Sequence, residues 1–171
     1  MNRSNDGKTA RVFRVVLKCT ALFAWIYLIF GFSSDTGEES SQKSGSLLIS
    51  IVNWLFPSLG ANMDNYQNIA ALENSEKLLR KLAHMFEYGI LAFLALILLF
   101  EVSEYIKLIR SNRYINVYTV SELLVLLVGS IDEINQLQTP GRYGSPTDVL
   151  VDCLGGALAL ALFFLTHRKT T

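Results

Sequence analysis

Four apolar stretches constrain this chain more than any other feature. They cover roughly residues 12–32, 82–100, 117–137 and 147–166. A bilayer core about 30 Å thick needs roughly 20 mostly apolar residues in a helix, so each stretch is long enough to cross it. Charged residues make up only 18% of the sequence and hydrophobic residues 51%, a balance that favours a membrane protein. We therefore expect an all-α membrane protein with four transmembrane helices in a single domain, residues 1–171.

Two other interpretations of these stretches are weaker. The first stretch has a basic flank, as a cleaved signal peptide does, but no A-x-A cleavage site follows it. The four helices could instead form a soluble bundle, in which each surface helix would carry a polar face. Residues 88–100 have no such face, so the membrane interpretation is preferred.

The positions of the basic residues predict the orientation of the helices. These residues gather before or at the start of the first stretch, between the second and third, and after the fourth: Arg3, Lys8, Arg11, Arg14, Lys18, Lys107, Arg110, Arg113, Arg168 and Lys169. Because basic loops stay in the cytoplasm, we expect a multi-pass protein of the cell membrane with both termini cytoplasmic. Arg14 and Lys18 lie one turn apart and are expected to reach the inner headgroups. Residues 33–81 and 138–146 are then extracytoplasmic.

The long extracytoplasmic loop contains a helical pattern of its own. Its apolar residues Leu47, Leu48, Ile51, Trp54 and Leu55 recur at helical spacing between residues 45 and 57. This pattern predicts a short interfacial helix with Trp54 as its anchor in the headgroup region. A further helix is expected to start near residue 75 and to continue into the second span.

Polar side chains gather at the extracytoplasmic ends of the last three spans. The set is Arg80, His84, Glu87 and Tyr88, then Asp132, Glu133, Asn135 and Gln136, and finally Arg142, Ser145, Asp148 and Asp152. Ionisable groups inside a membrane are costly and mark functional sites. Spacings of four and three place Arg80, His84 and Glu87 on one helix face. We expect one polar cluster, in which the arginines can pair with the acids. Because acids outnumber bases, at least one carboxyl is expected to be protonated, metal-bound or open to a cationic ligand.

The residue types in this cluster suit acid–base chemistry on a phosphate. A carboxylate beside a histidine can act as a general acid or base, and two arginines can hold a phosphate group. The candidate catalytic residues are His84, Glu87, Asp132 and Glu133. A histidine with several carboxylates could also hold a divalent cation. The motifs H-x-x-x-H, H-E-x-x-H and G-x-S-x-G are absent, so we assign no metal ligand and leave the cofactor open.

Several of these residues also have purely structural interpretations. Ser145 to Asp148 fit a helix capping box, with Pro146 at the first helical position. Arg142 in its Pro-Gly turn could simply contact lipid phosphate. The small side chains of Gly155, Gly156 and Ala159 predict a close contact with a neighbouring helix.

At these residues the sequence resembles the VanZ-like family of small multi-pass membrane proteins from bacteria. The resemblance is carried by Phe32-Ser33-Ser34-Asp35, by R-K-x-x-H-x-x-E-Y from Arg80, by D-E-x-x-Q from Asp132 and by P-G-R-x-x-S-x-x-D from Pro140. The family is named for a protein linked to teicoplanin resistance. This sequence departs from the family at Asp35 and Asp152, where glutamine and asparagine are usual, and each departure adds an acid to the cluster.

The resemblance implies a candidate site without assigning roles to its residues. Its motif positions are Ser33, Ser34, His84, Glu87, Asp132, Glu133, Gln136, Arg142 and Asp148. Of these, we take Ser33, Ser34, Gln136, Arg142 and Asp148 as candidate ligand-binding residues and add Arg80, which opens the second motif.

Three kinds of function remain open at this point. The leading hypothesis is that the protein binds or acts on a lipid, glycolipid or cell-wall headgroup at its outer face, and lowers susceptibility to glycopeptides such as teicoplanin. The alternative is a non-catalytic binding or structural membrane protein that changes access to the envelope. Proton-coupled transport is disfavoured because no chain of acids reaches the cytoplasmic side. The expected partners are membrane lipids and a lipid, glycolipid or glycopeptide ligand. Nucleic acid is not an expected partner, because the net charge is zero and nucleic-acid binding needs a concentrated basic surface.

Overall fold

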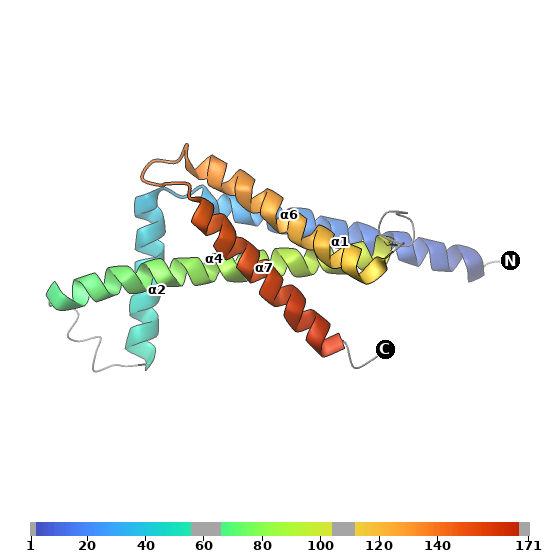
Figure 1. Cartoon of the computed structure of the whole chain (residues 1–171), viewed down its shortest axis with the longest axis horizontal. Coiled ribbons are helices and arrows are strands. Elements are labelled where there is room, and N and C mark those ends of the chain that lie inside the picture. Colours follow the sequence, from blue (N-terminus) through green and yellow to red (C-terminus); the bar gives the residue numbers. More distant parts are fainter. Residues whose placement is uncertain (1–2, 56–65, 104–111, 168–171) are drawn as a thin grey trace.

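The computed structural model describes residues 3–55, 66–103 and 112–167, and within these ranges the chain is helical with no strand (Figure 1). The helices are α1 (Arg3–Ser33), α2 (Gly37–Leu55), α4 (Tyr66–Val102), α6 (Arg113–Gln136) and α7 (Pro146–His167). The prediction of an all-α fold is confirmed.

Four of these helices are long and apolar enough to cross a membrane. The segments are Gly7–Ser33, Asn74–Val102, Arg113–Gln136 and Pro146–His167. They confirm the four predicted spans, although the first three begin several residues earlier than predicted. Large apolar side chains such as Phe23, Leu126, Leu150 and Leu162 remain exposed on the outer faces of the helices. Exposed apolar surface of this extent marks a membrane-facing protein.

Helix α4 lies at the centre of the bundle. It packs against α1, α2, α6 and α7, while α6 also contacts α1 and α7. The side chains between these helices form one apolar core that includes Leu22, Ile29, Tyr88, Leu91, Leu96, Val125 and Leu160. The apolar core thus occupies the middle of the bundle, and the polar residues described below lie toward its ends.

Helices α4 and α7 approach each other backbone to backbone. A Cβ atom added at Gly155 would collide with the backbone of Met85, and one added at Gly89 would lie 3.3 Å from the carbonyl oxygen of Gly155. Only a glycine allows this approach. Ala159 packs against Gly89, and Gly156 faces Val125 of α6. The predicted close contact of the small-residue face is therefore confirmed.

The helix in the long loop is longer than predicted. α2 begins at Gly37 because Thr36 and Glu39 form a reciprocal capping box. The Thr36 amide donates to Glu39 Oε2 at 2.9 Å, and the Glu39 amide donates to Thr36 Oγ1 at 3.2 Å. Figure 1 shows α2 running across α4 instead of along it. Trp54 is exposed, and the interfacial position of this helix stays a prediction. α4 begins at Tyr66, well before residue 75.

The turns after α1 and α6 meet at one end of the bundle, and the two chain termini lie at the other (Figure 1). The Gly37 amide donates to the Pro140 carbonyl at 3.1 Å, which joins the two turns. At the end with the termini, Glu101 of α4 contacts Lys18 at 2.7 Å and Arg14 at 3.2 Å. Both bases therefore pair with the Glu101 carboxylate, and their expected contact with the inner headgroups stays a prediction.

Candidate functional site

The base of the site is a group of buried polar side chains at the inner surface of α6. Asp132 is 0% exposed, and Gln136 lies one turn further along the helix. Gln136 Nε2 donates to Asp132 Oδ2 at 3.0 Å and to Ser33 Oγ of α1 at 2.9 Å. Asp132 Oδ1 makes no hydrogen bond within the described residues. Burying a carboxylate with so few partners is costly, so this position favours a functional role.

Glu133 is held by the backbone of the turn that leads into α7. Its Oε2 accepts a hydrogen bond of 2.7 Å from the Ser145 amide. Ser145 Oγ in turn accepts from the Thr147 amide at 3.2 Å, so Ser145 caps the first turn of α7. Asp148 does not close the predicted capping box but pairs with Lys81 of α4 at 2.9 Å. Glu133 therefore fixes the α6–α7 turn, and its expected catalytic role stays untested.

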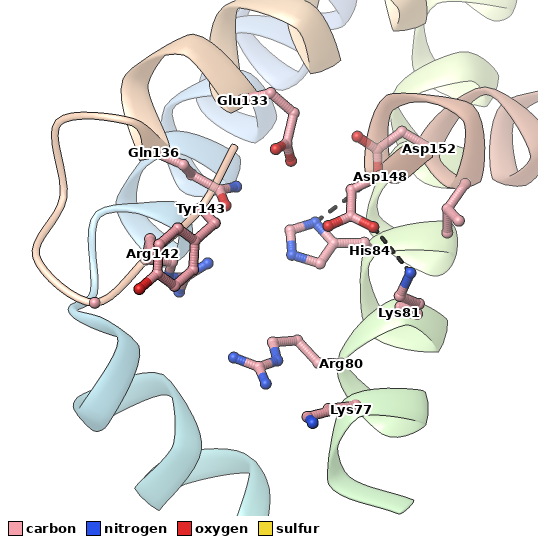
Figure 2. A pocket seen from close by; sticks show the side chains of 12 residues that line it. Lys77, Arg80, Lys81, His84, Glu133, Gln136, Arg142, Tyr143, Asp148 and Asp152 are labelled. Atoms are coloured by element: carbon pink, nitrogen blue, oxygen red, sulfur yellow. Dashed lines mark hydrogen bonds and ion pairs between the residues drawn. The ribbon is translucent and has the colours of Figure 1, made fainter. Parts of the chain in front are cut away.

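His84 projects from α4 toward two carboxylates. Its Nδ1 lies 3.9 Å from Asp152 Oδ1 and 4.0 Å from Glu87 Oε2. Asp152 is 1% exposed, and neither of its carboxylate oxygens makes a hydrogen bond within the described part of the chain. Figure 2 shows the imidazole with one nitrogen toward Asp152 and the other toward the open centre of the site. A histidine oriented in this way can move a proton between a carboxylate and a bound ligand.

These side chains surround a cavity of about 310 Å³ (Figure 2). We call it the headgroup cavity after the ligand expected from the sequence, and its binding of such a ligand stays a prediction. Its lining residues are Lys77, Arg80, Lys81, His84, Glu133, Gln136, Gly141, Arg142, Tyr143, Val151, Asp148 and Asp152. The cations come mainly from α4 and the buried acids from α6 and α7. The cavity thus presents positive charge on one side and carboxylates on the other.

Two arginines face this cavity from opposite elements. Figure 2 shows Arg80 extending from α4 toward the loop that carries Arg142. Arg142 Nε donates to the Asp35 carbonyl at 3.1 Å, and Arg80 lies 3.9 Å from Glu76 of its own helix. Among the residues that the structure describes, neither arginine therefore forms the expected ion pair with an acid of the cluster. Burial lowers the pKa of Arg142, and repulsion from Arg80 lowers it further, while attraction to Asp132, Asp35 and Glu133 partly offsets both effects.

A second cleft of about 590 Å³ adjoins the headgroup cavity. It lies against α1, α2 and α4, and it shares Arg80, His84 and Arg142 with the headgroup cavity. Glu87 lines this cleft. The two spaces are therefore neighbours that share three side chains.

The structure brings most of the predicted site residues together. Those that line the headgroup cavity are Arg80, His84, Glu133, Gln136, Arg142 and Asp148. Asp132 and Ser33 are both hydrogen-bonded to Gln136. Ser34 is not brought to the cluster, because it is exposed and its hydroxyl donates to the Phe30 carbonyl of its own helix.

Sequence reasoning missed several residues of the cavity wall. Lys77 lies three residues before Arg80, and Lys81 follows Arg80 directly. The two lysines are thus four residues apart. Their helical spacing to one another and to His84 would have placed them on the same side of α4. Asp152 was recognised in the cluster but given no role. Tyr143 is 88% exposed and had no signal in the sequence.

The described residues include no group of three or more His, Cys, Asp or Glu side chains that could hold a metal ion. A model of the family described as VanZ/LLP1 matches residues 19–167. No curated protein matches the chain, and neither does any solved structure.

Proposed function

The chain belongs to the VanZ/LLP1 family, and we propose that this four-helix membrane protein binds the phosphate-bearing headgroup of an envelope lipid in the headgroup cavity. The observation that carries the proposal is the convergence of Arg80 and Arg142 on one cavity. The two guanidinium groups repel each other, and an anion between them would replace that repulsion with two attractions.

Phosphate is the anion that this arrangement suits best. A guanidinium group offers a planar fork of donors that matches two phosphate oxygens. Arg142 uses its Nε for the Asp35 carbonyl, which leaves its terminal nitrogens to a ligand. Lys77 adds a positive charge to the same wall. The acids opposite, Glu133 and Asp152, would accept hydrogen bonds from hydroxyl or amine groups of the same headgroup.

The basic residues support an orientation in which the cavity faces the outer leaflet. Arg14 and Lys18 contact Glu101, and Arg113 contacts Phe100, near the C-terminal end of α4 and far from Arg80. In a variant lacking Cys19 and Cys153, Tyr143→Cys is expected to react with a membrane-impermeant maleimide in intact cells. Asn112→Cys, from the other end, is expected to react only after permeabilisation. The reverse pattern would overturn the orientation.

A second candidate function is acid–base catalysis on the bound headgroup. It is favoured by His84, whose Nδ1 is close to Asp152 and Glu87. If this second function is correct, His84→Gln is expected to change the affinity for the headgroup by no more than about threefold, because both arginines remain. The same variant is expected to abolish turnover of a labelled lipid. If the wild-type protein binds the lipid without converting it, the function is binding alone, through which the protein changes envelope access and teicoplanin susceptibility.

Binding itself is tested by calorimetry on the purified protein with dihexanoyl phosphatidylglycerol. Arg80→Gln and Arg142→Gln each remove a charge-assisted hydrogen bond worth about 1.5–3 kcal/mol, so each is expected to weaken binding by roughly 10- to 100-fold. Arg113→Gln is the matched control, because Arg113 donates to the Phe100 carbonyl at the far end of the bundle. Equal affinities for the wild type and the two cavity variants would overturn the proposal.

A further inference from the structure

An apolar groove of about 660 Å³ lies between α4 and α7. Its walls include Leu82, Phe86, Gly89, Leu158, Leu162 and Phe163. At Gly89 and Gly155 the two helices touch through their backbones, and beyond this crossing α7 diverges from α4 (Figure 1). The groove is therefore formed by the divergence of two helices that meet at glycines.

The second cleft borders both the headgroup cavity and the groove. That cleft shares Arg80, His84 and Arg142 with the headgroup cavity, and it shares Leu82 and Phe86 with the groove. The α4 side chains that line these spaces are thus mainly charged in the headgroup cavity, mixed in the second cleft and apolar in the groove. The order matches an amphiphile, in which a charged headgroup is joined to a hydrocarbon chain.

We propose that the groove between α4 and α7 holds a hydrocarbon chain of the same anionic lipid whose phosphate lies between Arg80 and Arg142. This inference rests on the proposed headgroup binding and names the ligand class as a membrane amphiphile with a long chain. Lipid tails are as apolar as the groove walls, so the chain is retained by packing in the groove and by its tethered headgroup. Occupancy of the groove must then depend on the headgroup cavity.

That dependence is measured with a phosphatidylglycerol that carries a diazirine in its acyl chain, in liposomes containing the full-length protein. After photolysis, mass spectrometry of peptides compares labelling at the groove residues Leu158 and Leu162 with labelling at Leu154 and Leu165. The last two are exposed on α7 and do not line the groove. Arg80→Gln combined with Arg142→Gln is expected to lower groove labelling at least about tenfold and to leave Leu154 and Leu165 unchanged. Groove labelling that is unchanged in the double variant would overturn the inference.

A variant that fills the groove separates chain binding from headgroup binding. Leu158→Trp is expected to abolish groove labelling and to leave the affinity for dihexanoyl phosphatidylglycerol within about twofold of the wild type. Leu154→Trp, the matched control, is expected to change neither. If the arginine variants still bind dihexanoyl phosphatidylglycerol as the wild type does, the proposed function fails. If that binding depends on the arginines while Leu158→Trp leaves groove labelling intact, only the chain site fails.

Discussion

Gln136 of α6 donates a hydrogen bond of 2.9 Å from Nε2 to Ser33 Oγ, the last residue of α1. The same nitrogen donates to Asp132 Oδ2 at 3.0 Å. All three side chains are buried. One amide thus joins two helices that are far apart in the sequence and supplies a partner to a buried carboxylate.

Replacing this amide should destabilise the protein. Gln136→Leu leaves Asp132 Oδ2 and Ser33 Oγ without their donor, and an unsatisfied buried polar group costs about 1–3 kcal/mol. The free energy of unfolding in detergent, followed by circular dichroism, is expected to fall by that amount. Gln138→Leu is the control, because Gln138 is exposed and its replacement should change stability by less than about 0.5 kcal/mol. Equal effects of the two substitutions would remove the structural role given to Gln136.

The crossing of α4 and α7 should not tolerate a methyl group. The Cβ atom of Gly155→Ala would collide with the backbone of Met85, and such overpacking costs about 1–3 kcal/mol. Gly31→Ala should not destabilise the protein, because a Cβ atom there meets nothing within 4 Å and alanine is the better helix former. Thermal unfolding of both variants in the same detergent checks the difference. A Gly155→Ala protein as stable as the wild type would show that the helices can separate freely.

The start of α2 should depend on pH through Glu39. The backbone and side-chain hydrogen bonds of Thr36 lower the pKa of Glu39 below its ordinary 4.5. A group with a lowered pKa in the folded state stabilises it above the pKa of the unfolded state, and that stability is lost as the pH falls through the folded pKa. The Ser40 amide, which donates to the Thr36 carbonyl, is therefore expected to lose hydrogen-exchange protection below about pH 4.

Glu39→Gln should abolish this pH dependence, whereas Glu38→Gln should retain it. Glu38 is the neighbouring acid in the first turn of α2 and takes no part in the reciprocal bonds with Thr36. Protection at Ser40 that falls with pH in the Glu39→Gln protein as it does in the wild type would assign the transition to another group.

The fold and the convergence of the site could be predicted because they follow from length, polarity and connectivity. A span of apolar residues must be helical in a bilayer, and four consecutive spans bring alternate loops to the same side. The sequence therefore predicts that residues near 80, 136 and 142 lie at the same end of the bundle. The resemblance to the VanZ-like family, shown by the match over residues 19–167, pointed to the same residues.

The pairing of individual side chains could not be predicted, because it depends on helix rotation and crossing. Ser33 and Ser34 are adjacent, yet only Ser33 faces α6. Asp148 fits a capping box in the sequence, but the approach of α4 brings Lys81 to it. The groove between α4 and α7 arises from a crossing at two glycines, which periodicity alone does not reveal.

Native mass spectrometry of the protein purified in a mild detergent tests the phosphate-binding account most directly. The wild-type protein and the Arg113→Gln control are expected to retain a lipid whose fragmentation releases a phosphate-bearing headgroup. The protein with both Arg80→Gln and Arg142→Gln is expected to carry none. A wild-type protein free of phosphate-bearing lipid, or a double variant that carries as much as the wild type, would contradict the account.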